Sequence, residues 1–243
     1  MFNYASVVGM MWYIHTNTRP DLGYSLSSAA RFSFNTKRSH EEALMRIGQY
    51  LKGAATRGLI LKPMTTKAMT LDVYVDSDFM GLCGAETRDN PENVKSRAGH
   101  VMLLNGCPIV WSSKLMQQVA LSTMMAEYCA LSAAMKEVPP LQEVIKKTSV
   151  GLGIADDCTT EFKTTIWEDN MGALTLAQNE PGQHTVRSKF YDVRVHWFRE
   201  HLHSPNSNMS VLKIDTKAQL ADLFTKPLPR ETFERLRMML MGW

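Results

Sequence analysis

The stretch LDVYVDSDFMG, residues 71–81, decides the fold of this 243-residue chain. Apolar and polar residues alternate along it, which predicts a β-strand with one buried face. Asp76 and Asp78 stand near the end of that strand, and they share a face because side chains two residues apart in a strand point to the same side. Paired carboxylates at a strand end fit two opposite chemistries, the joining of nucleotides and the cutting of a nucleic-acid strand.

The residues after this stretch predict an α/β chain with a mixed five-stranded sheet. AGHVMLLNG (98–106) and CPIVWSS (107–113) form a hairpin around Asn105-Gly106, a strong two-residue turn signal. Pro139-Pro140 predict a break or strong kink near Val138. The other expected elements are, in chain order, helices over 124–135 and 141–153, a strand over 163–169, helices over 170–179 and 188–202, a strand over 209–215, and a helix over 216–224 that begins at a Thr216 cap. From residue 70 the order is βββαβααβα.

Helical segments flank this α/β part on both sides. Residues 1–62 are helical in pattern, and Ser39 is expected to cap the third helix with Glu42 as its reciprocal partner. A polar linker follows, and an amphipathic helix closes the chain. The predicted organisation is a small helical segment over 1–62, an α/β domain over 70–228 and a C-terminal helix over 229–243.

Four acidic residues fall at the ends of different predicted elements. They are Asp76 on the first strand, Glu127 on the long helix, Asp169 at the end of the fourth strand and Asp222 in the helix after the fifth. This element order brings the first and fourth strands together at the centre of the sheet, so the carboxylates are expected to meet at one edge. Clustered carboxylates repel one another unless divalent cations neutralise them, and all-oxygen ligands suit Mg²⁺ or Mn²⁺.

Composition sets further expectations. The net charge of +3 and pI near 8.6 permit a polyanionic partner. No apolar run is long enough for a membrane span and no secretion signal opens the chain, so an intracellular protein is expected. The four cysteines match no metal-binding spacing and are expected to be reduced thiols.

Five motifs that run through residues 74–229 are YVDSDFMG (74–81), GCPIVWSSK (106–114), ALSTMMAEYCALSAAMKE (120–137), IWEDNMGALTLAQN (166–179) and QLADLFTKPLP (219–229). Together they resemble the ribonuclease H domain of Ty1/copia-type retrotransposon Pol polyproteins. Upstream, the motifs YASVVGMMWYI (4–14), TRPDLGYSLSSAARF (18–32) and ALMRIGQYLKGAATRGL (43–59) resemble the end of the reverse transcriptase region, its thumb and connection. Met1 falls inside that upstream region, so the chain is expected to be a fragment of a longer polyprotein.

The resemblance implies a ribonuclease H-like fold and an endonuclease that hydrolyses the RNA strand of an RNA/DNA hybrid with two Mg²⁺ ions, or Mn²⁺ in their place. It assigns the roles of catalytic residue and metal ligand to Asp76, Glu127, Asp169 and Asp222. Two such ions activate water and stabilise the leaving oxygen. The implied partners are the hybrid and the palm and fingers of a reverse transcriptase, in a cytoplasmic virus-like particle or the nucleus, with no membrane.

Substrate contacts are expected from side chains around the acidic residues, because a hybrid is recognised through its sugars and phosphates. The candidates for sugar contacts are Ser77, Asn170 and Gln178. The candidates for phosphate contacts are Lys95, Arg97, Lys114, Arg187 and Lys189. His184 is a candidate proton carrier near the leaving group. Glu168, next to Asp169, is expected to point to the opposite face of its strand.

Two alternatives stay open. A polymerase palm needs two adjacent aspartates in a hairpin turn, whereas Ser77 separates Asp76 from Asp78, so the nuclease interpretation is favoured. The second alternative is a catalytically inactive ribonuclease H-fold module that binds nucleic acid or a polymerase partner. Altered family positions, such as Met124-Met125 in TMMAEY, leave the four carboxylates in place but change their surroundings.

Overall fold

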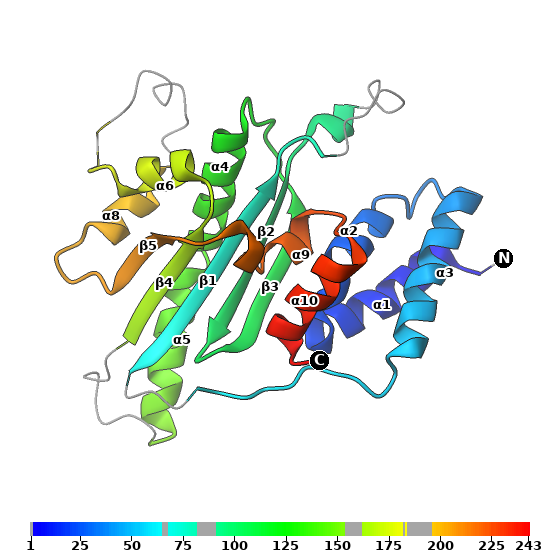
Figure 1. Cartoon of the computed structure of the whole chain (residues 1–243), viewed down its shortest axis with the longest axis horizontal. Coiled ribbons are helices and arrows are strands. Elements are labelled where there is room, and N and C mark those ends of the chain that lie inside the picture. Colours follow the sequence, from blue (N-terminus) through cyan, green and yellow to red (C-terminus); the bar gives the residue numbers. More distant parts are fainter. Residues whose placement is uncertain (1, 65–67, 82–90, 154–161, 182, 184–195) are drawn as a thin grey trace.

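The core of the molecule is a five-stranded mixed sheet in the order β3-β2-β1-β4-β5 (Figure 1). The computed structural model describes residues 2–64, 68–81, 91–153, 162–181, 183 and 196–243. The strands are β1 (Met69–Asp78), β2 (Arg97–Leu104), β3 (Cys107–Leu115), β4 (Phe162–Glu168) and β5 (Met209–Lys213). β2 pairs antiparallel with β1 and β3, whereas β4 pairs parallel with β1 and β5. The expected ribonuclease H-like sheet and element order are confirmed.

The β2–β3 hairpin turns at the predicted dipeptide. Asn105 and Gly106 have φ of 46° and 81°, the left-handed conformation that a two-residue hairpin turn requires. The Asn105 side-chain oxygen also accepts a hydrogen bond from the Thr70 backbone N–H at 2.8 Å. The turn therefore joins β2 to β3 and also supports the start of β1.

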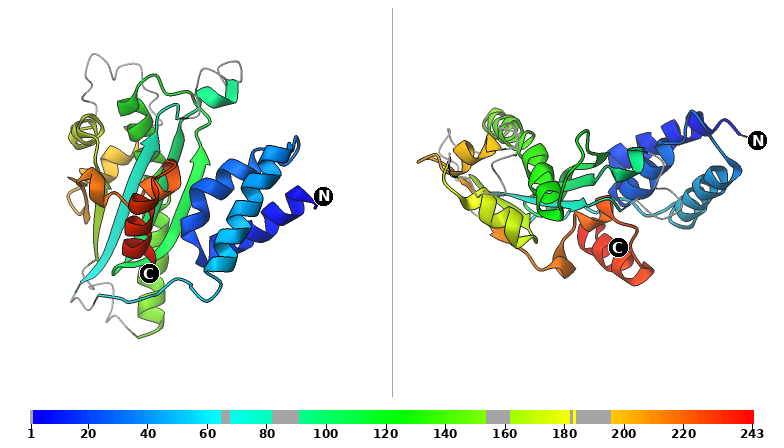
Figure 2. Two further views of the ribbon diagram at one scale, coloured as in Figure 1. Left: turned by 45° about the vertical axis from the view of Figure 1, so that its right-hand side comes forward. Right: turned by 90° about the horizontal axis from the view of Figure 1, so that it is seen from above.

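One face of the sheet is covered by α4 (Thr123–Met135) and α5 (Val138–Gly151), as Figure 2 shows. Ser122 caps α4, because its hydroxyl accepts a hydrogen bond from the Met125 N–H at 3.1 Å. The predicted break is confirmed: Pro139-Pro140 lie in the first turn of α5, where a missing N–H costs little. Helices α6 (Met171–Gln178) and α8 (Phe198–Leu202) share the same hydrophobic core.

The other face is covered by α9 (Asp222–Thr225) and α10 (Arg230–Met241). The prediction of one helix over residues 216–224 is wrong. Asp215, not Thr216, caps a 3₁₀ turn over Thr216–Ala218, and α9 begins only at Asp222. Gln219 separates the two pieces in an extended conformation, because its buried side-chain amide donates to the Val75 backbone oxygen at 2.8 Å.

The N-terminal helices lie beyond the β3 edge of the sheet (Figure 2). They are α1 (Tyr4–Thr18), the 3₁₀ turn η1 (Pro20–Leu22), α2 (Gly23–Ala30) and α3 (Arg38–Gly53); a further 3₁₀ turn, η2, spans Pro91–Val94. The helices share a small core, and the Ser27 hydroxyl of α2 donates to the Ser113 backbone oxygen of β3 at 2.9 Å. The predicted Ser39 cap is wrong, since α3 begins at Arg38 and the His40 ring accepts from the Lys37 N–H.

Candidate metal centre

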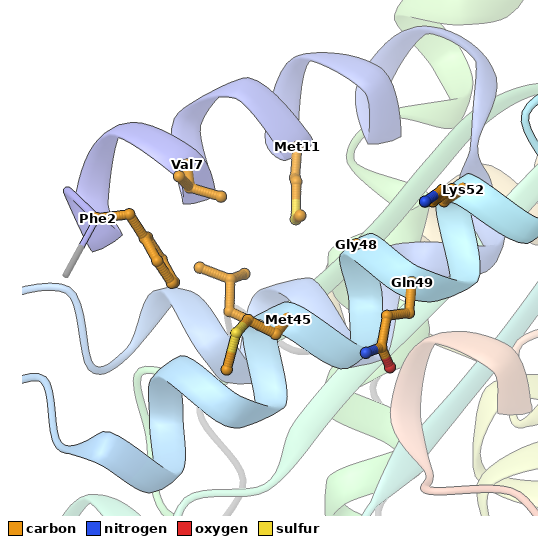
Figure 3. A pocket seen from close by; sticks show the side chains of 8 residues that line it. Phe2, Val7, Met11, Met45, Gly48, Gln49 and Lys52 are labelled. Carbon is orange, nitrogen blue, oxygen red and sulfur yellow. The ribbon is translucent and has the colours of Figure 1, made fainter.

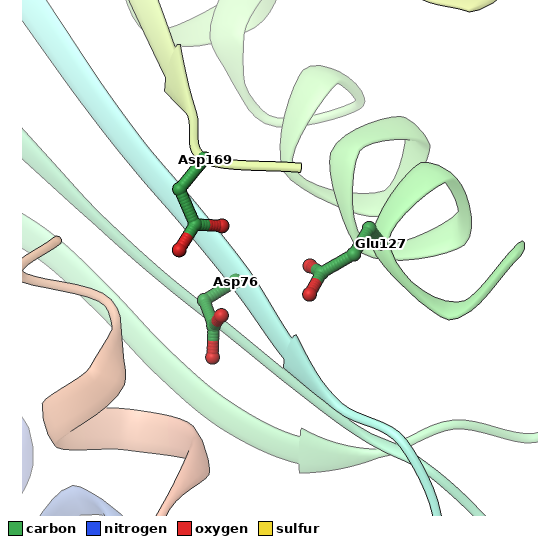
Figure 4. Close-up of side chains that lie close together, drawn as sticks. All are labelled: Asp76, Glu127 and Asp169. Carbon is green, nitrogen blue, oxygen red and sulfur yellow. The ribbon is translucent and has the colours of Figure 1, made fainter. Parts of the chain in front are cut away.

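Three of the four predicted carboxylates converge at one point. Asp76 on β1, Glu127 on α4 and Asp169 just after β4 each offer an oxygen, and these oxygens lie within 4.8 Å of one another (Figure 4). The parallel pairing of β1 and β4 brings the carboxyl ends of both strands to the same edge of the sheet. α4 packs over that edge and contributes Glu127 from its first turns.

A glycine on β2 lets the other face of the sheet approach this group. Gly99 pairs with Asp76, and a Cβ atom at Gly99 would lie 2.7 Å from side-chain atoms of both Phe224 and Thr225. Only a residue without a side chain fits there. α9 therefore packs directly on the β2 backbone, which places Thr225 and the following Lys226 beside Asp76.

Both oxygens of Asp76 are engaged. The Thr225 hydroxyl donates to Asp76 Oδ2 in a short hydrogen bond, and the Lys226 ammonium donates to Asp76 Oδ1 at 2.8 Å. The same ammonium also donates to Asp222 Oδ1 at 2.7 Å. Asp222, the fourth predicted ligand, thus joins Asp76 through Lys226 and does not belong to the three-oxygen group.

Burial dominates the electrostatics of the site. It raises the pKa of Asp76 to about 7, against the opposing effect of Lys226. Burial, followed by the charges of Asp76 and Glu168, raises the pKa of Glu127 to about 10. Glu127 Oε2 is buried and has no hydrogen-bond partner among the described residues. Burial also raises the pKa of Asp222, and Lys226 opposes that shift.

Glu168 lies close enough to this acidic group to interact electrostatically with Glu127, Asp169 and Asp76, while its place on the strand face opposite Asp169 stays a prediction. Its side chain is completely buried at the end of β4, and its Oε1 accepts the Asn170 N–H at 2.9 Å. Burial raises the pKa of Glu168 to about 8, and the charges of Asp169 and Asp76 add to that shift. Glu168 is still part of β4, where it pairs with Lys213 of β5, and the alternation of burial along Ile166, Trp167 and Glu168 continues to the end of the strand.

The residues present fit a divalent cation. The group offers carboxylate oxygens only, which hard cations such as Mg²⁺ and Mn²⁺ prefer. A buried carboxylate oxygen without a partner is costly, and a bound cation would satisfy Glu127 Oε2. A cation would also offset the repulsion that keeps protons on these acids.

The candidate sugar contacts are all engaged within the protein or buried. Ser77 is 3% exposed. The Asn170 side-chain oxygen caps α6 by accepting from the Gly172 and Ala173 N–H groups, and the Gln178 amide donates to the Val211 backbone oxygen at 3.1 Å. Their contacts to a substrate stay predictions.

The candidate phosphate contacts differ in exposure. Lys114 is exposed and lines a groove of about 370 Å³ beside the start of α4. The expectation for Arg97 is wrong, because Arg97 is 2% exposed and its guanidinium donates to the hydroxyls of Ser27, Ser28 and Ser113. Lys95 is half-buried. His184, Arg187 and Lys189 lie outside the described residues.

Other features of the described chain lie apart from the acids. An apolar cavity of about 390 Å³ opens between α1 and α3, lined by residues such as Phe2, Met11 and Met45 (Figure 3). Cys107 and Cys129 are free thiols, as expected. Among the described residues, no helix is both long enough and apolar enough to cross a membrane.

Sequence reasoning missed Thr225, Lys226 and the electrostatic interaction of Glu168 with the acidic group. Lys226 follows Asp222 by four residues, a spacing that brings side chains together on a helix, so the motif ADLFTK carried a usable signal.

The strand order, strand directions and flanking helices form a ribonuclease H-like fold. Among solved structures, LC11-RNase H1 isolated from compost is 14% identical with a TM-score of 0.41, over 70% of this chain and 98% of that chain. No family model matches the chain.

Curated relatives extend over nearly the whole sequence. The Retrovirus-related Pol polyprotein from transposon TNT 1-94 of Nicotiana tabacum is 32% identical over 231 residues, 95% of this chain and 16% of its own length. The corresponding polyprotein from transposon RE1 of Arabidopsis thaliana is 30% identical over 95% of this chain and 14% of its own. The chain is thus homologous to a segment of Ty1/copia-type Pol polyproteins, and it spans about a sixth of these relatives.

Proposed function

We propose that this chain is a ribonuclease H-type endonuclease that hydrolyses the RNA strand of RNA/DNA hybrids with two divalent ions. The observation that carries the proposal is the convergence of Asp76, Glu127 and Asp169 within 4.8 Å, on a ribonuclease H-like sheet. Mg²⁺ is the proposed ion, with Mn²⁺ as a substitute.

The residues of the site have different proposed roles. Asp76, Glu127 and Asp169 would hold one ion, and Asp76 with Asp222 would hold the other. When bound, such a pair of ions supplies an activated water and stabilises the leaving oxygen of the phosphodiester. Thr225 orients Asp76 by donating to its second oxygen. Glu127, which is only 4% exposed, would present its carboxylate to the ion from the side of α4.

The proposed setting is a retrotransposon polyprotein. Homology to Pol polyproteins over 95% of the chain supports it. The proposed partners are the RNA/DNA hybrid and the reverse transcriptase palm and fingers of a longer chain. The proposed compartment is intracellular, either a cytoplasmic virus-like particle or the nucleus.

The direct test is cleavage of a hybrid labelled on its RNA strand. With Mg²⁺ present we expect cutting of the RNA strand, little cutting of duplex DNA, and no cutting after addition of a chelator. Asp76→Asn is expected to lower the rate by at least about 100-fold, because the shared ligand of both ions loses its charge.

A matched control is Asp72→Asn, which changes an aspartate on the same strand outside the acidic group and should leave cleavage unchanged. Two results together would contradict the proposed nuclease activity: no cutting by the folded chain, and equal binding of the hybrid with and without Mg²⁺. They would favour a binding module of the same fold.

A further inference from the structure

Lys226 places a positive charge inside the acidic group. Its ammonium lies 2.8 Å from Asp76 Oδ1 and 2.7 Å from Asp222 Oδ1. The Asp76 side chain is 1% exposed and the Asp222 side chain 9%, whereas the Lys226 side chain is 32% exposed. The cation therefore reaches in from the solvent side to two nearly buried anions.

The position of this ammonium coincides with the pair of carboxylates proposed to hold the second ion. Asp76 is shared: one of its oxygens lies within 4.8 Å of oxygens of Glu127 and Asp169, and its Oδ1 also accepts from the Lys226 ammonium. A divalent ion between Asp76 and Asp222 and the Lys226 ammonium cannot both stay there, because two cations would then compete for the same oxygen atoms and repel each other.

The Lys226 side chain is also free to change its position. It follows the last turn of α9 in an extended conformation, and its side chain has a flexible four-carbon stem. The partial exposure of the side chain gives the ammonium a route to water. Thr225, by contrast, is completely buried and its hydroxyl stays on Asp76 Oδ2.

We propose that Lys226 is an internal counter-cation that neutralises the Asp76–Asp222 pair and is displaced into solvent when a second divalent ion binds. The first ion, at Asp76, Glu127 and Asp169, binds without this displacement. The inference rests on the two-ion site of the proposed function. Under this proposal, Lys226 determines how tightly the site binds the second ion.

The first experiment measures Mn²⁺ binding to the full chain by isothermal titration calorimetry, without substrate. Lys226→Met keeps the length of the stem and removes the charge, and Lys226→Arg keeps the charge. We expect Lys226→Met to bind the second Mn²⁺ at least tenfold more tightly than the unaltered chain, with the first site changed by less than about threefold. Lys226→Arg should behave as the unaltered chain. Equal second-site affinity in all three proteins would overturn the proposal.

A second measurement uses the unaltered chain, so it holds even if a variant fails to fold. Lysine acetylation by a water-soluble reagent is followed by mass spectrometry with and without saturating Mn²⁺. We expect acetylation of Lys226 to rise at least threefold with the ion, and acetylation of Lys147, which is 77% exposed, to stay constant. Unchanged or slower acetylation of Lys226 would refute the displacement. Neither readout uses hybrid cleavage, so a failed nuclease assay would leave both interpretable.

Discussion

Buried acids at the site tie the stability of the metal-free protein to pH. The pKa of Glu127 is raised from 4.5 to about 10 and that of Glu168 from 4.5 to about 8, in both cases mainly by burial. A raised pKa means that the folded chain holds the proton more tightly than the unfolded chain. The resulting stabilisation is complete below about pH 4.5 and is lost as pH rises through about 8 for Glu168 and about 10 for Glu127.

The variant Glu168→Gln tests this at one residue. Gln is neutral at every pH and keeps an oxygen for the Asn170 N–H. We expect its free energy of unfolding to match that of the unaltered chain near pH 4 and to exceed it near pH 8, with a difference that grows by up to about 1.4 kcal/mol for each pH unit above about 4.5. Urea denaturation in the absence of metal, at both pH values, measures the free energy of unfolding of the two proteins. If the variant were less stable than the unaltered chain by the same amount at both pH values, the protonated state of Glu168 would be contradicted.

Single residues also mark the limit of what the sequence predicts. Asp76 and Asp169 could be predicted to lie together because each stands near the carboxyl end of one of two neighbouring parallel strands, whereas Glu127 of α4 was assigned through the resemblance of its motif. Lys226 was missed because surface lysines are common and only coordinates show one folded inward. Glu168 shows a further limit: alternation gives the face of a strand on which a side chain lies, but not how strongly it interacts with an acid on a packed helix such as Glu127.

Among the elements, the contact of α9 with β2 decides whether the fourth acid reaches the site. Gly99→Ala would put a methyl group 2.7 Å from both Phe224 and Thr225. We expect a loss of about 1–3 kcal/mol in the free energy of unfolding, because overpacking pushes α9 off the sheet. We also expect weaker binding of the second Mn²⁺, because Asp222, its proposed ligand, and Thr225 move with α9. Urea denaturation and calorimetric titration measure the two effects.

Gly9→Ala is the matched control. Gly9 is an exposed residue of α1 with open space around its Cβ position. Alanine is favoured over glycine inside a helix, so this variant should be more stable by about 0.5–1 kcal/mol and bind Mn²⁺ unchanged. Equal effects of the two variants on metal binding would contradict a specific role for the α9–β2 contact.

The strands and the short helix α6 were predictable as elements, but α9 was not. β1 and the β2–β3 hairpin follow from alternation and from Asn105-Gly106, which are local signals. The predicted helix over 216–224 fails because Gln219 gains a hydrogen bond to β1, a partner 144 residues away in sequence. Local propensity carries no information about such a partner.

At the scale of the whole molecule, a buried polar network joins the first helices to the last one. Arg19 and Asp21 are 3% and 4% exposed and form a bidentate ion pair. The guanidinium donates to Asp21 Oδ1 at 2.9 Å and to Asp21 Oδ2 at 2.7 Å. The Tyr50 hydroxyl donates to Asp21 at 2.5 Å and accepts from Arg237 of α10 at 3.1 Å. α10 packs in turn on the sheet. The helical segment and the sheet are therefore expected to unfold together, even though each has its own hydrophobic core.

Asp21→Asn tests this cooperativity. It leaves the buried Arg19 guanidinium without its carboxylate, which should cost about 3–5 kcal/mol of unfolding free energy. Glu42→Gln, which breaks the exposed Arg38–Glu42 pair, is the control and should cost less than about 1 kcal/mol. Under conditions where amides exchange through global unfolding, hydrogen exchange by mass spectrometry should speed up about 100-fold or more in Asp21→Asn, equally in peptides from α3 and from β2–β3. Faster exchange confined to α1–α3 would mean that the helices unfold on their own and that the acidic group depends only on the sheet and on α9.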